Sequence, residues 1–301
     1  MTILHAVLLV VLSAIWGASF VFIRLAAPAF GPLPLMATRM VIAVAALLAY
    51  VAFTRARLDL GRDRRRFIVL GAFNAAIPFA LIATAELRLN ASLASILNST
   101  TPLFSVFVAR IAFGATLRWP QVVGAVVGIG GVAALVGVAE VSGDRSFLLA
   151  VAASLAAALS YAIGASYAGR AFPGLRPLDL TLGQLVGAAV VLLPGALLTL
   201  PRSAPPPEAV GALLALAILG TVVGYLIYFR LIAAVGPTRT TAVTLLIPVF
   251  GVVFGSVFLG ETPSASLLVG LVLVLAGVSL VTGAVAGPRP GPPSDGGAQA
   301  V

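Results

Sequence analysis

Ten apolar stretches follow one another along the chain, and they constrain its fold more than any other feature. An α-helix that crosses roughly 30 Å of hydrocarbon needs about 20 apolar residues. The stretches lie at residues 5–26, 33–53, 67–87, 91–112, 119–139, 147–169, 178–200, 208–231, 240–259 and 265–285. Charged residues make up only 9% of the 301 residues, too few to cover the surface of a soluble domain of this length. The sequence therefore predicts an all-α integral membrane protein with ten transmembrane helices.

The connections between the stretches are short and rich in glycine and proline, so we expect no inserted soluble domain. The first stretch has neither the basic leading segment nor the small-residue cleavage site of a secretory signal, and we count it as a span. Residues 286–301 form a low-complexity tail, which we expect to be disordered and cytoplasmic.

Arginines are divided unevenly between the two ends of the predicted spans. If the N-terminus is cytoplasmic, thirteen arginines fall in the inner segments and four in the outer ones, and Arg39 lies within a span. Cytoplasmic loops of membrane proteins carry such an excess of positive charge, which accounts for the net charge of +9 without a nucleic-acid partner. We expect a multi-pass protein of the cell inner (plasma) membrane with both termini cytoplasmic.

A weak internal repeat relates the two halves of the chain at an offset of about 146 residues. Its register is defined by one proline and three glycines that recur: Pro102 and Pro248, Gly114 and Gly260, Gly124 and Gly270, Gly131 and Gly277. Each half holds five spans, an odd number, so the second copy enters the membrane from the opposite side. Such inverted repeats are typical of secondary transporters, whose substrate site lies near the midplane between the halves. We divide the chain into a first repeat at residues 1–140 and a second at 141–285.

Four segments and one arginine carry a resemblance to a known family. They are IWGASFVFIRLA (15–26), Arg39, NASLASILNSTTPLFSVFVA (90–109), VVGAVVGIGGVAALV (122–136) and TLLIPVFGVVFGSVFLGETPSASLLVGLVLVLAGVSLV (244–281), of which the last is the most specific. They are similar to the ten-helix permeases of the drug/metabolite transporter superfamily, which contain two EamA-type domains. The resemblance covers essentially residues 5–285 and implies export or exchange of small metabolites through a central cavity lined by both halves. The chain departs from the family at Ala115, opposite Glu261, because the family usually has an acidic residue at both places.

Small polar residues and a proline share one face of the fourth stretch. Ser95, Asn98 and Pro102 are spaced at i, i+3 and i+7, which places them on the same side of a helix. The repeat carries this face to the ninth stretch, at Thr241, Thr244 and Pro248. Two such faces, each beside a proline that frees a backbone carbonyl, would suit a symmetric substrate cavity. The alternative is that the hydroxyl and amide groups only hold helices together, at about 0.6 kcal/mol each.

Two further polar side chains lie inside spans. A cation at the bilayer centre costs roughly 2.5–3.5 kcal/mol on insertion scales, so Arg39 needs a compensating partner. It either balances a substrate carboxylate or bonds to carbonyls near the outer surface. Asn74 shares a face of the third stretch with Pro78, and it either lines the cavity or satisfies carbonyls freed by that proline.

Aromatic side chains near mid-span are further candidates for substrate contact: Trp16, Phe79, Tyr161, Tyr225 and Tyr228. They could stack on a substrate or donate hydrogen bonds, or they could pack the bundle or form an interfacial belt. The glycines of the fifth and tenth stretches suit close helix packing or a homodimer face.

Residues for enzymatic or metal chemistry are missing from the sequence. It has no cysteine and a single histidine, His5, and no metalloprotease, nucleophile-elbow or Walker motif, so we expect no enzyme, metal or cofactor. No Asp or Glu lies at mid-span, and we expect Glu261 to be structural at the outer rim. We therefore expect a neutral or zwitterionic metabolite, such as an amino acid, with facilitated efflux, exchange and proton antiport all open. Multidrug efflux and a non-transporting membrane scaffold or sensor are the competing interpretations.

Overall fold

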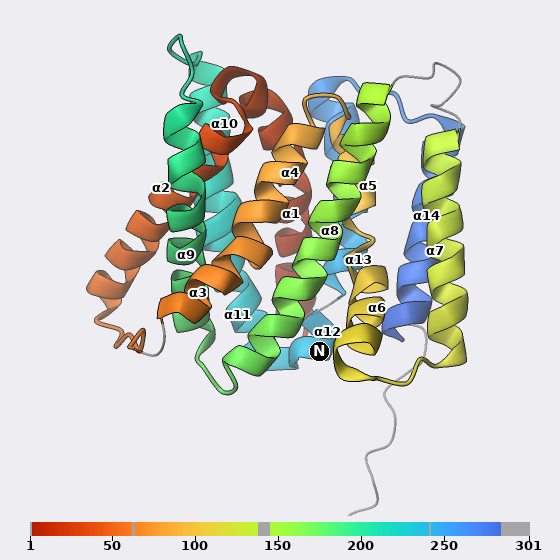
Figure 1. Ribbon diagram of the computed structural model, residues 1–301, viewed down its shortest axis with the longest axis horizontal. Helices are drawn as coiled ribbons and strands as arrows, with labels where there is room; N and C mark the ends of the chain where they lie inside the picture. The colour runs from red at the N-terminus through yellow and green to blue at the C-terminus, as the bar shows by residue number, and fades with distance from the viewer. Residues whose placement is uncertain (1, 62–63, 138–144, 241, 284–301) are drawn as a thin grey trace, which may run out of the picture.

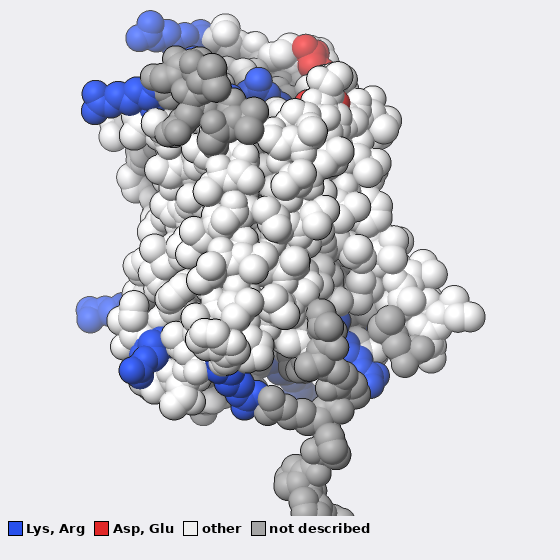
Figure 2. Space-filling model, turned by 90° about the vertical axis from the view of Figure 1, so that its right-hand side faces the viewer, with Lys and Arg blue, Asp and Glu red and all other residues white. Residues whose placement is uncertain are grey.

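The computed structural model describes residues 2–61, 64–137, 145–240 and 242–283. Within these ranges every regular element is a helix, which confirms the predicted all-α fold. Nine of the described helical runs are long and apolar enough to cross a bilayer, and a tenth, Val243–Leu259, is shorter. The surface agrees with a membrane-spanning bundle. On the face drawn in Figure 2, charged side chains lie at the two ends of the molecule and an uncharged band separates them.

The helices of the first half occupy the five stretches predicted for it. They are α1 (Ile3–Phe30), α2 (Pro32–Thr54), α3 (Arg64–Gly71), the π-helix η1 (Ala72–Ala76), α4 (Ile77–Ala85), α5 (Ala91–Asn98), α6 (Thr101–Phe113) and α7 (Trp119–Gly137). Proline stands in the first turn of α2, where its missing N–H costs nothing, and also in the first turns of α4 and α6, which follow closely on η1 and α5.

The helices of the second half follow the same order. They are α8 (Arg145–Ala171), α9 (Pro177–Leu198), α10 (Pro207–Ala217), the π-helix η3 (Ile218–Val223), α11 (Gly224–Val235), α12 (Pro237–Thr240), α13 (Val243–Leu259) and α14 (Ala265–Thr282). In Figure 1, α1 rises from the end that carries the N-terminus, whereas its counterpart α8 descends towards that end. The two halves therefore run through the molecule in opposite directions.

Contacts between the halves come in exchanged pairs, as an inverted repeat requires. Helix α1 packs against α13, and correspondingly α8 packs against α5 and α6. Helix α4 packs against α8, and its counterpart α11 packs against α1. Two counterparts also pack directly on each other, α2 on α9 and α7 on α14. Each half thus forms much of its core with the other half.

The third and eighth stretches each contain a short π-helix at their middle. The first π-helix begins at residue 72 and the second at residue 218, which is 146 residues later and matches the register of the repeat. A π-helix holds one extra residue per turn and is often found at functional sites. At η3 the hydroxyl of Thr221 donates to the carbonyl of Leu216 at 3.2 Å, five residues back.

The fourth stretch forms one span, Ala91–Ala112, as predicted, but two helices build it. Helix α5 ends at Asn98 and α6 begins at Thr101, whose hydroxyl donates to the carbonyl of Asn98 at 2.8 Å. Pro102 has no N–H to continue the ladder to Asn98, so the helix restarts there. Pro248, its counterpart in the repeat, lies inside the continuous helix α13.

Glycines allow α7 and α14 to touch backbone to backbone. A Cβ atom placed on Gly124 would lie 2.6 Å from the carbonyl oxygen of Gly277, and one placed on Gly131 would lie 2.8 Å from the nitrogen of Val274. Either distance is too short for a side chain. These glycines therefore serve packing within the molecule, and homodimerisation stays an expectation.

Candidate functional site

A cavity of about 370 Å³ lies between the two halves at the level of the π-helices. Its walls come from α1, α2, η1, α4, α5 and α6 of the first half and from α8, η3, α11 and α13 of the second. Ten residues singled out from the sequence line it: Trp16, Arg39, Asn74, Phe79, Asn98, Pro102, Tyr161, Tyr225, Tyr228 and Thr244. Their role in substrate binding stays a prediction, but the fold brings them to one place.

Two residues of the predicted polar faces, Ser95 and Pro248, lie outside the cavity wall. Ser95 is buried in α5, where its hydroxyl donates to the carbonyl of Ser92 at 2.8 Å, and it is not part of the cavity wall. The break after Asn98 separates Ser95 from the face that continues in α6. Pro248 is buried in α13 beside the lining residue Ile247 and does not line the cavity either. Thr241 lies outside the described residues.

Arg39 is buried beside the cavity and held in place from two sides. Its side chain is only 4% exposed, and Nε donates to the hydroxyl of Thr221 at 3.0 Å. The guanidinium carbon lies 4.0 Å from the ring centre of Phe79, a cation–π contact. Phe79 in turn meets Tyr161 edge to face, with ring centres 6.1 Å apart. No Asp or Glu is found among the residues that line this cavity, so the positive charge faces no anion there.

Gln184 on α9 fixes two of the lining residues, and it was not predicted from the sequence. The amide of Asn74 donates to Gln184 Oε1 at 2.7 Å, and Gln184 Nε2 donates to the hydroxyl of Tyr225 at 3.1 Å. The segment PLPLMATR at 32–39 aligns with PLDLTLGQ at 177–184, which places Gln184 opposite Arg39. This alignment with Arg39 is the sequence feature that indicates a role for Gln184. Thr221 lies opposite Ala75 in the repeat, so no such feature indicates a role for it.

Trp16 forms the second aromatic group of the cavity. Its indole N–H donates to the carbonyl of Gly220 in η3 at 3.1 Å. Its ring centre lies 6.2 Å from that of Tyr225 and 5.5 Å from that of Tyr228. These rings give the wall an apolar surface that also carries phenol groups able to donate hydrogen bonds.

Asn98 supplies an acceptor that the protein leaves unused. Its Oδ1 atom is buried and has no hydrogen-bond partner among the described residues. An unpartnered buried acceptor costs about 1–3 kcal/mol, which a ligand with a donor group would recover. The cavity therefore combines a cationic donor at Arg39 with a free acceptor at Asn98.

Exposure along the cavity shows which end is open. The lining residues Ile23, Phe79 and Ile82 are buried, whereas Thr101 and Tyr228 are half-buried. The buried set lies in the later part of α1 and α4, away from the N-terminus, and the half-buried set lies towards the end that carries it. From this gradient in exposure we infer that the cavity is open towards the N-terminal end and closed at the opposite end.

Glu261 holds the closed end together. Its carboxylate accepts the backbone N–H groups of Ala91 at 2.8 Å and Ser92 at 3.0 Å, and it also accepts the Ser92 hydroxyl. A carboxylate at a helix N-terminus satisfies free donors and complements the helix dipole. The connection after α13 is thereby fastened to the start of α5.

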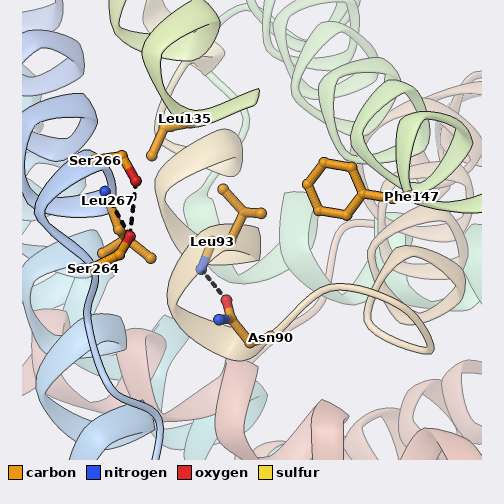
Figure 3. Close-up of a pocket in the computed structure, with 7 residues that line it drawn as sticks. All are labelled: Asn90, Leu93, Leu135, Phe147, Ser264, Ser266 and Leu267. Carbon is orange, nitrogen blue, oxygen red and sulfur yellow. Dashed lines mark hydrogen bonds between the residues drawn. The ribbon is translucent and has the colours of Figure 1, made fainter. Parts of the chain in front are cut away.

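A second cavity, of about 300 Å³, lies at this closed end between α5, α7, α8 and α14 (Figure 3). Leu93, Leu135 and Phe147 give it an apolar wall. Its polar groups serve as helix caps: Asn90 Oδ1 accepts from the N–H of Leu93 at 2.8 Å, and Ser264 Oγ accepts from that of Leu267 at 3.2 Å. None of the described residues that line it carries a charge, so we take the central cavity as the candidate site.

Comparisons with known proteins fit this arrangement. Residues 4–137 and 148–283 each match the EamA-like transporter family. A probable terminal-alkyne amino-acid exporter from Streptantibioticus cattleyicolor is 27% identical, over 91% of this chain and 92% of that protein. A probable amino-acid metabolite efflux pump from Salmonella typhimurium is 28% identical (88% and 90%), and the uncharacterized inner membrane transporter YedA from Escherichia coli K12 is 26% identical (89% and 87%). A crystal structure with 19% identity superimposes with a TM-score of 0.66, over 94% of this chain and 99% of that one, and shows the same fold.

Proposed function

The chain belongs to the EamA-like transporter family, and from that membership we propose that it exports or exchanges small neutral or zwitterionic metabolites, such as amino acids, by alternating access. The proposal is carried by one observation: the buried Arg39 guanidinium and the unpartnered Asn98 oxygen line the same cavity. A zwitterion has one group for each of them. Two relatives whose names refer to amino-acid export support this substrate class.

The chemistry of binding follows from the two groups. A substrate carboxylate would accept charge-assisted hydrogen bonds from Arg39, the strongest kind available in the cavity. A substrate ammonium would donate to Asn98 Oδ1 and face the aromatic rings of Trp16 and Tyr228. An organic cation without a carboxylate would meet the positive charge of Arg39 with nothing to offset it, so this cavity favours metabolites over cationic drugs.

The open end of the cavity indicates which step of transport the structure represents. The excess of arginine at the N-terminal end supports a cytoplasmic position for that end by the positive-inside rule. We infer that both termini are cytoplasmic, that the chain resides in the inner (plasma) membrane, and that the cavity is open to the cytoplasm. An exporter loads its substrate in this state.

The test is efflux of radiolabelled amino acids from proteoliposomes that contain the purified protein. Arg39→Gln removes the cation and should lower kcat/KM about tenfold or more, since a hydrogen bond to a charged group contributes roughly 1.5–3 kcal/mol. Arg88→Gln is the matched control, because Arg88 is exposed and lies outside the cavity. Equal flux in the Arg39→Gln and wild-type proteins would contradict the assigned role of Arg39.

A second arm separates transport from the competing interpretations. Asn98→Leu and Thr244→Val should abolish amino-acid efflux at normal expression, whereas a scaffold or sensor without flux would keep its phenotype in both variants. If the wild-type protein moved cationic dyes and no amino acid, multidrug efflux would replace the present proposal.

A further inference from the structure

Glu86 has a buried carboxyl group that the rest of the molecule leaves without a partner. It lies in the turn after α4, is 0% exposed, and neither of its carboxyl oxygens has a hydrogen-bond partner among the described residues. Asp179 is equally buried, but its oxygens accept from Arg176 at 2.7 Å and from the N–H of Asp59 at 3.2 Å. An ionised carboxylate that is buried and unpaired costs several kcal/mol, so Glu86 requires an explanation that Asp179 does not.

The position of Glu86 places it at the closed end of the central cavity. Ile82, one helical turn earlier on α4, lines the cavity, and so does Ile23 on α1. Arg24, the residue after Ile23, reaches across with its guanidinium and donates to the backbone carbonyl of Glu86. The turn that holds Glu86 is therefore fastened to α1 just beyond the cavity, where substrate would have to pass when this end opens.

Charged groups from several elements act near the Glu86 carboxyl. Arg24 comes from α1, and Glu261 comes from the connection after α13. Burial raises the pKa of the Glu86 carboxyl well above its ordinary value; Arg24 opposes this effect and Glu261 adds to it. Helix α2 brings Arg39, which lies over Phe79 two turns nearer the cavity, and α8 begins with the exposed Arg145.

We propose that Glu86 is a proton-binding site of the transport cycle, which takes up one proton when the end of the cavity opposite the N-terminus closes and releases it when that end opens. This rests on the proposed function only in requiring that this end opens during transport. In the closed state the carboxyl is neutral, because neither water nor a donor reaches it. When the end opens, water solvates the carboxylate and Arg24 lies close enough to balance its charge. The proton is exchanged with the solution on that side, so it controls closure and is not carried across.

Infrared difference spectroscopy of the full-length protein in lipid vesicles tests the protonation directly. The wild-type protein should retain a carboxylic-acid C=O band at neutral pH, and Glu86→Gln should lose it. Glu208→Gln is the matched control: Glu208 is an exposed carboxylate in the first turn of α10 at the same end of the molecule, so its replacement should leave the band in place. A wild-type protein without the band, or a Glu86→Gln variant that keeps it, would overturn the proposal.

A second measurement tests the link to closure. The chain has no cysteine, so spin labels can be placed at Arg88→Cys and Arg202→Cys, two exposed positions at the closed end. Opening of this end should lengthen the distance between the two labels. In the wild-type background the population with the longer label-to-label distance should grow as the pH rises and Glu86 loses its proton. In the Glu86→Gln background, which mimics the protonated group, the shorter distance should persist at every pH. Populations that do not change with pH in the wild-type background would refute the coupling. Neither experiment needs a substrate, so a protein without amino-acid flux could still pass both, and the two proposals fail separately.

Discussion

Arg39 and Gln184 perform matching tasks on opposite sides of the cavity. Each comes from the second span of its half and reaches the π-helical segment of the other half: Arg39 donates to Thr221 in η3, and Gln184 accepts from Asn74 in η1. Gln184 also donates to Tyr225. The two contacts tie the halves together at the level where the substrate is proposed to bind. Gln184, which does not line the cavity, thus orients two residues that do, Asn74 and Tyr225.

Replacing Gln184 tests this positioning role. Gln184→Met keeps the volume of the side chain but leaves the amide of Asn74 and the hydroxyl of Tyr225 without their partner. Unpaired buried groups cost about 1–3 kcal/mol each, so we expect a lower melting temperature and a tenfold or greater loss of efflux in proteoliposomes. Gln121→Met is the control, because Gln121 accepts only from the N–H of Arg118, outside the cavity. A Gln184→Met protein with wild-type efflux would show that the orientation of Asn74 and Tyr225 does not matter.

At the scale of helices, the sequence predicts where spans lie but not where they are interrupted. The ten apolar stretches match the described helices because a span needs a certain length of apolar residues wherever it packs. The break after Asn98 and the two π-helices leave that length almost unchanged, so hydropathy does not detect them. The π-helices have tertiary partners, since the Ser160 hydroxyl donates to the carbonyl of Phe73 in η1 and the Trp16 indole donates to that of Gly220 in η3. Because hydropathy and helical spacing do not detect these interruptions or tertiary bonds, they wrongly predict Ser95 in the cavity wall and do not predict the role of Gln184.

The contact of α7 with α14 gives a prediction at the scale of two helices. Gly131→Ala would place a Cβ atom 2.8 Å from a backbone nitrogen, so the helices must separate and the protein should lose about 1–3 kcal/mol of stability through overpacking. Gly130→Ala, one residue away on the same helix, meets nothing within 4 Å and should stabilise by about 0.5–1 kcal/mol through better helix propensity. Thermal unfolding of both variants in detergent measures the difference. Equal melting temperatures would show that the helices do not touch at Gly131.

For the whole molecule, the two ends of the cavity differ in the hydrogen bonds that hold their helices together. Glu261 follows the left-handed Gly260 (φ 66°) and caps α5 at the closed end. Its counterpart in the repeat is Ala115, which follows the left-handed Gly114 (φ 64°) and is exposed. Among the described residues, the repeat therefore supplies no equivalent carboxylate at the N-terminal end. This difference favours a state that is open at the N-terminal end, as the structure is.

Adding the missing carboxylate should shift this balance. Ala115→Glu should favour closure of the N-terminal end by about 0.5–2 kcal/mol, the usual contribution of a helix cap. The measurement is the rate at which a thiol reagent modifies Thr101→Cys, a half-buried position on the cavity wall, in a protein with no other cysteine. We expect a several-fold slower reaction with Ala115→Glu and no change with the uncharged Ala115→Gln. An equal slowing by both variants would point to bulk and not to charge.

The π-helices at residues 72–76 and 218–223 also bear on the history of the chain. An extra residue inserted at the same point of both halves is most simply inherited from one ancestor, so we infer that the insertion preceded the gene duplication. Such an ancestor is a five-helix chain, two antiparallel copies of which would enclose a cavity. Its chain therefore had to enter the membrane in both orientations, which requires nearly equal numbers of positive charges at its two ends. On this inference, the strong arginine bias of the present chain followed the fusion of the two copies, which fixed the orientation of each.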